Sequence, residues 1–180
     1  MIVAISGTPG SGKTSLAKIL KDKGYKILNL NEIADREEFI LEVDKKRDSK
    51  IVDIDKLDRF VEKKYSQEED VVFVESHLSH LLKYVDLVII LRCHPRELKN
   101  RLSDRNWSEE KTRENIEAEV LDVILCEAVD VHEENKVFEI DTTDSNLADV
   151  VSAVVDIVKD KDRKRYNIGD IDWSDEIFKK

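Results

Sequence analysis

The residues with the clearest chemical potential form one short segment near the N-terminus. Residues 7–14 read GTPGSGKT and match the phosphate-loop pattern G-x-x-x-x-G-K-[ST], between a strand-like apolar run and a segment of helical period. Backbone N–H groups of such a loop bind phosphate oxygens, Lys13 reaches the β- and γ-phosphates, and the Thr14 hydroxyl is a ligand for Mg²⁺. The segment predicts nucleoside triphosphate binding. An ordinary strand-to-helix turn is the weaker alternative, because three of the chain's five glycines fall within these eight residues.

A second candidate group follows a later apolar run. Residues 71–75 read VVFVE, the form of a strand that places a carboxylate beside the metal and its waters, so Glu75 is a predicted Mg²⁺ partner. His77 lies two residues on and could orient a water or an acceptor group, since imidazole titrates near neutral pH. The alternatives are a solvated strand end for Glu75 and ordinary polar surface for His77 or His80.

Arginines form the third group, because phosphoryl transfer needs positive charge on the migrating group. Arg92 ends a predicted strand, and Arg101 and Arg105 lie four residues apart on the predicted helix that follows. We favour Arg105 as catalytic, since it ends that helix where a closing flap would hinge. Arg36 is a candidate for the phosphate of a second nucleotide. For each arginine the alternative is a surface or helix-pairing role, and for Arg36 it is a surface arginine beside acidic neighbours.

The elements that must position these residues follow from the hydrophobic pattern. Short apolar runs alternate with charged segments of helical period, which predicts an α/β protein with a parallel sheet. The predicted strands are residues 2–5, 25–28, 71–74, 87–91 and 137–140, and the predicted helices are residues 13–23, 55–65, 95–105, 108–132 and 146–158. Between residues 29 and 54 the pattern weakens, which indicates an insertion at the carboxyl edge of the sheet. We expect one domain over residues 1–160 and a docking or partner-binding tail over residues 161–180.

Composition excludes several classes of protein. Apolar residues make up 41% of the chain but come in short runs, so no membrane span is expected and a cytoplasmic location is predicted. Cys93 and Cys126 belong to no C-x-x-C pair, which argues against a zinc or redox motif. Forty acidic against 30 basic residues give a formal charge of -10. That charge disfavours strong direct nucleic-acid binding and favours a basic protein partner.

Several motifs together resemble one family. They are the phosphate loop GTPGSGKT, REE and IVDIDKL in and after the insertion, the acid-x-His of residues 75–77, LR at residues 91–92, and RLSDRNWSEEKTRENIEAEVLDVILCEA from residue 101. The chain resembles the atypical adenylate kinases of the nucleus and of archaea, which double as ATPases in maturation of the small ribosomal subunit. The family member compared carries Asp at the position of Glu75. The resemblance implies the nucleoside monophosphate kinase fold, with a five-stranded parallel sheet and helices on both faces.

The same resemblance implies site residues, substrates and partners. It implies a monophosphate-binding insertion at about residues 29–52 and a short lid at about residues 103–113. We expect Arg36, Asp53 and Arg92 to bind the acceptor. Arg105 would be the lid arginine on ATP. The loop residues of the ATP site would be Gly10, Ser11, Gly12, Lys13, Thr14 and Ser15.

The implied reaction is ATP plus AMP giving two ADP, with Mg²⁺ as cofactor and tolerance for other monophosphates. ATP hydrolysis would assist ribosome assembly through a basic small-subunit ribosomal protein and the subunit precursor. Two alternatives stay open: an assembly ATPase with negligible kinase activity, and a small-metabolite kinase of the same fold. A non-enzymatic interaction protein is disfavoured, because Lys13, Thr14 and an acid at a strand end are all present.

Overall fold

The computed structural model describes residues 1–44, 49–105 and 107–178. Parts of the predicted insertion (45–48), lid (106) and tail (179–180) lie outside these residues. The strands are β1 (Ile2–Ser6), β2 (Lys26–Asn29), β3 (Ile40–Asp44), β4 (Ser49–Val52), β5 (Val72–Glu75), β6 (Leu87–Arg92) and β7 (Val137–Asp141). The helices are α1 (Lys13–Asp22), α2 (Leu30–Arg36), α3 (Ile54–Tyr65), α4 (Pro95–Ser103), α5 (Glu109–Val120), α6 (Val123–Val131) and α7 (Leu147–Val158), with short 3₁₀ turns at Ser79–Leu81, Glu134–Lys136, Arg163–Tyr166 and Ser174–Phe178.

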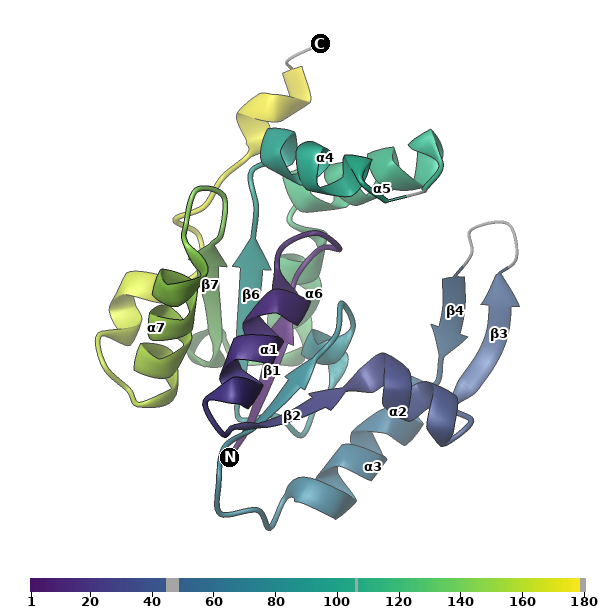
Figure 1. Ribbon diagram of the computed structural model, residues 1–180, viewed down its shortest axis with the longest axis vertical. Helices are drawn as coiled ribbons and strands as arrows, with labels where there is room; N and C mark the ends of the chain where they lie inside the picture. The colour runs from purple at the N-terminus through teal and green to yellow at the C-terminus, as the bar shows by residue number, and fades with distance from the viewer. Residues whose placement is uncertain (45–48, 106, 179–180) are drawn as a thin grey trace.

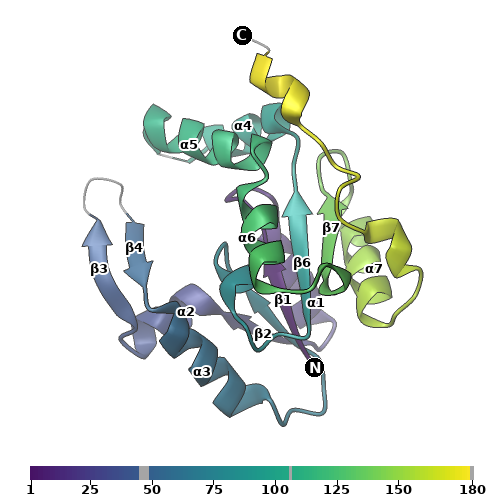
Figure 2. The ribbon, with the colours of Figure 1, turned by 180° about the vertical axis from the view of Figure 1, so that it is seen from behind.

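The five predicted strands form one parallel sheet in the order β2-β5-β1-β6-β7, which confirms the predicted fold class. The strands are apolar on both faces because helices cover both, as a parallel sheet requires. Helices α1 and α7 pack on one face with the core around Phe73 and Ile89. Helices α3 and α6 pack on the other with the core around Val74 and Ile90. Figures 1 and 2 show these two layers from opposite sides.

The insertion contains structure that the sequence pattern did not indicate. After α2, strands β3 and β4 form an antiparallel hairpin that stands beyond β2 (Figure 1). Its side chains Leu41, Val43 and Ile51 are exposed. Exposed apolar residues blur the alternation of buried and exposed positions by which a strand is usually predicted, so the hairpin was missed.

The predicted helix over residues 108–132 is wrong in one respect, because it is two helices. The chain breaks at Asp122, which has φ of 53° and lies in the left-handed region. A non-glycine residue at positive φ is uncommon and persists where its surroundings hold it. The Asp122 carboxylate bonds to the buried Arg92, and this contact holds the residue at the break in place.

The C-terminal tail docks on the body. Asn167 bridges to Phe138 of β7, and the Trp173 ring meets the His94 ring edge-on with centroids 4.9 Å apart. Arg96 forms a 3.2 Å ion pair with Glu176. The tail therefore packs against the start of α4, next to which it is seen in Figure 1. Within the described residues, no helix has the length and apolar character needed to cross a membrane.

Candidate active site

The phosphate loop joins β1 to α1 at the carboxyl edge of the sheet. Gly7, Gly10 and Gly12 all have positive φ, between 98° and 138°, which side chains with a Cβ rarely adopt. A Cβ on Gly10 would lie 2.8 Å from Leu98 Cδ1 of α4, so the close approach of α4 also requires glycine there. Gly12 precedes the first residue of α1. The loop thus leads its backbone amides into the positive end of that helix.

Two side chains of the loop fit a bound polyphosphate. Lys13 is 9% exposed, and its Nζ donates to the carbonyl oxygens of Gly7 at 2.6 Å and Thr8 at 3.1 Å. Burial is the main cause that lowers the pKa of Lys13 to about 8, while the charges of Glu75 and Glu119 oppose the shift and Arg105 adds to it. Ser11 Oγ is buried and has no hydrogen-bond partner within the described part of the chain. A polar atom without a partner, beside a loop of amides, suits an anionic ligand.

Glu75 ends β5 in the sheet position next to the loop, because β1 pairs with β5 and places Ile5 opposite Glu75. Its side chain is buried, and its Oε1 accepts a 2.7 Å hydrogen bond from Asn29 Nδ2. Burial raises the pKa of Glu75, and the charge of Lys13 and the Asn29 bond act in the opposite direction. Asn29 is a site residue that the sequence analysis missed. Its position at the end of β2, on the same sheet edge, was the available signal.

The two histidines after Glu75 differ in exposure. His77 as a whole residue is exposed, but the atoms packed around its ring remove enough water that desolvation, followed by the charge of Lys13, lowers its pKa to about 4. The ring is therefore neutral at pH 7. His80 is 1% exposed and bonds Ser6 Oγ at 2.8 Å and Glu127 Oε2 at 3.0 Å. The alternative of ordinary polar surface for His80 is therefore wrong. Its ring sits between the end of β1 and α6 and has a packing role.

Arg105 follows α4 and is exposed. Its guanidinium lies over the Trp107 ring at 4.9 Å, and Lys111 Nζ lies 4.7 Å from the same ring. Trp107 packs in turn on the buried cluster of Cys93, Leu98 and Leu102. The aromatic ring therefore supports a cation beside the phosphate loop, and the charge of Arg105 is felt at Lys13.

Beside the loop lies a cavity of about 290 Å³. The loop lines it with Gly10, Ser11, Gly12 and Ser15, and Arg101 and Thr142 line it from α4 and from the segment after β7. Arg101 Nη2 donates to the carbonyl oxygens of Thr142 at 2.7 Å and Thr143 at 2.8 Å, which fixes this wall. The sequence analysis did not select Thr142, although it follows a predicted strand at the carboxyl edge.

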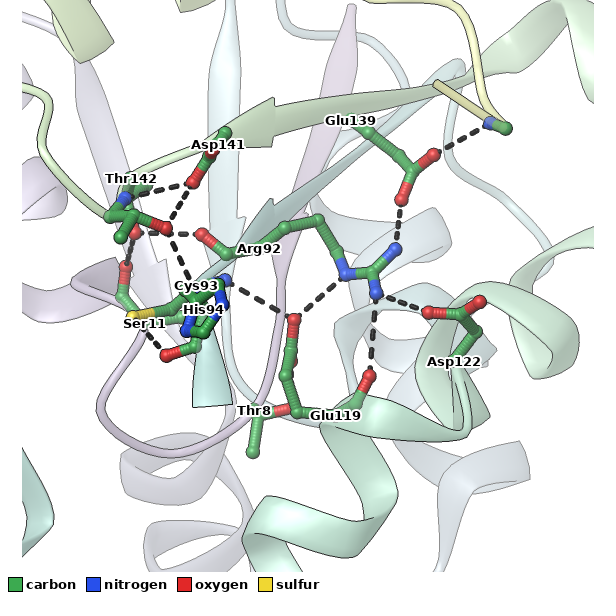
Figure 3. Close-up of polar contacts among 12 residues, drawn as sticks. Thr8, Ser11, Arg92, Cys93, His94, Glu119, Asp122, Glu139, Asp141 and Thr142 are labelled. Atoms are coloured by element: carbon green, nitrogen blue, oxygen red, sulfur yellow. Dashed lines mark hydrogen bonds and ion pairs between the residues drawn. The ribbon is translucent and has the colours of Figure 1, made fainter. Parts of the chain in front are cut away.

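The environment of Arg92 contradicts its predicted role in acceptor binding. It is 2% exposed, and all three of its side-chain nitrogens are engaged with protein oxygens. Nε donates to Glu119 at 2.8 Å, Nη1 to Glu139, and Nη2 to Asp122 and to the carbonyl oxygen of Glu119 (Figure 3). Arg92 is a buried structural arginine, because a charge at this depth is stable only when its partners surround it.

The remaining predicted residues lie apart from this group. Arg36 is an exposed arginine whose Nε pairs with Glu37 at 2.9 Å, in line with the surface alternative. Asp53 caps α3: its Oδ1 accepts from the N–H of Lys56 at 3.1 Å. The Thr14 and Ser15 side chains are exposed on the first turn of α1, beside the loop. The structure thus gathers the loop residues, Glu75, His77 and Arg105 near one edge.

Comparison with known proteins shows the family of this chain. A family model described as an AAA domain matches residues 3–122. A protein of Archaeoglobus fulgidus named "Putative adenylate kinase" is 44% identical over 98% of this chain and 94% of its own. The chain belongs to this adenylate kinase-like family.

Other relatives extend the likeness over the whole chain. A protein of Methanocaldococcus jannaschii with the same name is 37% identical over 99% of this chain and 96% of its own. One of Pyrococcus abyssi is 43% identical over 97% of this chain and 92% of its own. The structure of shikimate kinase from Acinetobacter baumannii covers 88% of this chain and 93% of its own at 14% identity, with a TM-score of 0.59. That last likeness concerns the fold alone.

Proposed function

We propose that this adenylate kinase-like protein transfers the γ-phosphoryl group of ATP to AMP and gives two ADP, with tolerance for other nucleoside monophosphates. In this reaction a phosphate oxygen of AMP bonds to the γ-phosphorus as the bond to the ADP oxygen breaks. The observation that carries the proposal is the placement of two buried charged groups at one sheet edge: the Lys13 ammonium inside the phosphate loop and the Glu75 carboxylate at the end of the adjacent strand β5. These are the groups that neutralise a transferring phosphoryl and hold its metal.

The donor nucleotide fits the loop and the adjacent cavity. The amides of residues 10–15 and the Lys13 ammonium would hold the phosphates, and the free Ser11 Oγ would gain a partner. The cavity lined by Arg101 and Thr142 would take the rest of the nucleotide. Arg105 would move from Trp107 onto the phosphates when the lid, residues 103–113, closes.

The acceptor would lie on the other side of Glu75, where the insertion of residues 29–52 is attached. Asn29 both caps α2 and bonds Glu75, so the first turn of the insertion is fixed to the candidate metal site. Arg36 is exposed on the same helix and is available for the acceptor phosphate. In this proposal Asp53 contributes through its cap on α3 and not through direct contact.

Magnesium fits the residues at this edge. The Thr14 hydroxyl is exposed at the start of α1, and the buried Glu75 carboxylate is held in place by Asn29, an oxygen set of the kind that Mg²⁺ prefers. When bound, Mg²⁺ would neutralise charge on the β- and γ-phosphates. Among the described residues, no group of three or more His, Cys, Asp or Glu side chains forms a separate protein-only metal centre.

Hydrolysis is the second candidate activity. His77 is exposed, and its lowered pKa leaves a neutral ring that can orient a water near the loop. A role in small-subunit maturation, with a basic ribosomal protein as partner, is supported by the family resemblance and by the net charge of -10. A pull-down with purified small-subunit proteins tests this role. Binding that does not weaken when salt is added would count against electrostatic recognition.

One assay separates the two activities. The protein is mixed with ATP and Mg²⁺, with and without AMP, and ADP is followed by chromatography. We expect ADP formation to rise strongly when AMP is added, with two ADP formed for each AMP consumed. ADP formation that does not depend on AMP would reject the kinase and leave the ATPase.

A further inference from the structure

A buried hydrogen bond ties the phosphate loop to the end of α5, the helix whose first turn belongs to the predicted lid. Thr8 Oγ1 donates to Glu119 Oε2 at 2.6 Å, and the two residues are 2% and 3% exposed. Thr8 belongs to the loop, whereas Glu119 lies in the last turn of α5. The bond therefore spans 111 residues of sequence and joins two parts of the candidate active site.

The carboxylate of Glu119 is itself held rigidly. Its other oxygen, Oε1, accepts from Arg92 Nε at 2.8 Å and from the N–H of Cys93 at 3.2 Å. Figure 3 shows the Glu119 carboxylate oxygen that Arg92 and Cys93 share. Donors to both oxygens leave the group little freedom to rotate, and such charge-assisted bonds are stronger where water is excluded.

Arg92 extends the anchor to the rest of the molecule. Its guanidinium also bonds Asp122, at the break after α5, and Glu139 of β7. The second oxygen of Glu139 accepts from the N–H of Gly169 at 2.8 Å, in the C-terminal tail. The end of α5 is thus fixed to the sheet and the tail, whereas the start of α5 falls within the predicted lid of residues 103–113, which carries Arg105.

We propose that Glu119 is a positioning residue: it holds the phosphate loop through Thr8 and anchors that loop to the C-terminal end of α5. The Thr8 hydroxyl is committed to Glu119, so it acts on the phosphates through the loop backbone. This inference takes one point from the proposed function, namely that the phosphate loop binds ATP.

The test compares Thr8→Val, which keeps the shape and removes the hydroxyl, with the matched control Thr8→Ser, which keeps the hydroxyl. Hydrogen exchange of the amides in residues 8–14 is measured without nucleotide, and ATP affinity is measured by calorimetry. For Thr8→Val we expect loop exchange about tenfold faster and ATP binding about tenfold weaker, the scale of one lost bond to a charged group. Thr8→Ser should restore both towards the wild-type values.

Kinetics separate positioning from general destabilisation. For Thr8→Val the KM for ATP should rise and kcat should fall, while the KM for AMP stays within about twofold. Glu119→Gln completes a double-mutant cycle with Thr8→Val, and the two effects should be strongly non-additive. Should Glu119→Gln fail to fold, the two Thr8 variants decide alone.

The outcomes that overturn the proposal are distinct from failure of the kinase assignment. The proposal would be refuted if Thr8→Val and the wild type had equal hydrogen exchange in the loop and equal ATP affinity. It would also be refuted if Thr8→Val only lowered the melting temperature, with exchange faster throughout the protein and not specifically in the loop. Exchange and binding need no turnover. A wild-type protein that binds ATP without transfer to AMP would therefore reject the proposed function and leave the positioning role testable.

Discussion

Asn29 Nδ2 donates a 2.7 Å hydrogen bond to Glu75 Oε1, which joins the ends of two adjacent parallel strands across the edge that holds the phosphate loop. The two residues are in register in the pairing of β2 with β5. Asn29 also accepts from the N–H groups of Asn31 and Glu32 and so caps α2. One side chain therefore sets both the orientation of the candidate metal carboxylate and the start of the insertion.

The first prediction concerns the charge of Glu75. Glu75→Gln keeps the side-chain length and can still accept from Asn29, but it removes the negative charge beside the metal. We expect phosphoryl transfer to fall by about 10²-fold and the Mg²⁺ concentration for half-maximal rate to rise. Initial rates over a Mg²⁺ titration measure both. Glu68→Gln, which alters a surface pair with Lys26, is the control. An unchanged Mg²⁺ dependence in Glu75→Gln would remove this residue from the metal site.

The second prediction concerns Lys13. Lys13→Ala removes the buried ammonium that we propose holds the phosphates, and both transfer and hydrolysis should fall by about 10²-fold or more, the scale of a lost preorganised donor. The control is Lys18→Ala. Lys18 is exposed on the same helix, so its removal should leave both rates unaltered. Steady-state assays with ATP and AMP give the comparison, and normal turnover by Lys13→Ala would refute the site.

The third prediction concerns the titration of Lys13. As the pH rises, the Lys13 contribution to stability should increase while the ATP affinity should decrease. Burial lowers the pKa of Lys13 from 10.5 to about 8, so between these values the unfolded chain binds more protons than the folded one. This residue's contribution to the free energy of unfolding therefore rises with pH across that window. ATP affinity should fall over the same window as the ammonium is lost. Calorimetry and urea unfolding from pH 7 to 10, each compared with Lys13→Met, isolate both trends. If the free energy of unfolding and the ATP affinity changed with pH in the same way in Lys13→Met and in the wild type, Lys13 would not be the titrating group.

The fourth prediction separates structural from functional arginines. Arg92→Met leaves Glu119, Asp122 and Glu139 without their shared cation, so the free energy of unfolding should fall by about 3–5 kcal/mol. Urea unfolding measures it. Arg113 is the control, because it forms an exposed ion pair with Glu117 at 3.5 Å. Arg113→Ala should lower the free energy of unfolding by no more than about 1 kcal/mol. A fully stable Arg92→Met with weaker AMP binding would restore the acceptor role for Arg92.

The fifth prediction tests the lid. Arg105→Ala removes one of the two cations that lie over Trp107 and leaves Lys111, and we expect kcat to fall and the KM for ATP to rise, while the KM for AMP changes little. Trp107 fluorescence should change on ATP addition in the wild type, since Arg105 leaves the ring. A Trp173→Phe background isolates the signal, and Trp107→Phe should abolish it. An ATP signal that persists in Trp107→Phe would show that another group moves.

The sequence by itself determined the parallel sheet, the phosphate loop and the acid at the end of β5. These follow from short-range rules: an apolar run covered on both faces, glycines where the backbone takes positive φ, and a lysine and hydroxyl at fixed offsets. Parallel strands also bring their carboxyl ends to one edge, so the grouping of Lys13, Glu75 and His77 was predictable from order along the chain.

Only the tertiary structure decided the role of Arg92, the break at Asp122 and the contact of Thr8 with Glu119. Each depends on side chains more than 25 residues apart, and no local pattern states which partner a buried charge will meet. Desolvation makes an unpaired charge costly, so the fold surrounds Arg92 with three carboxylates and bends the chain at Asp122 to supply one of them. An arginine at a strand end therefore looks the same in sequence whether it faces a substrate or the interior.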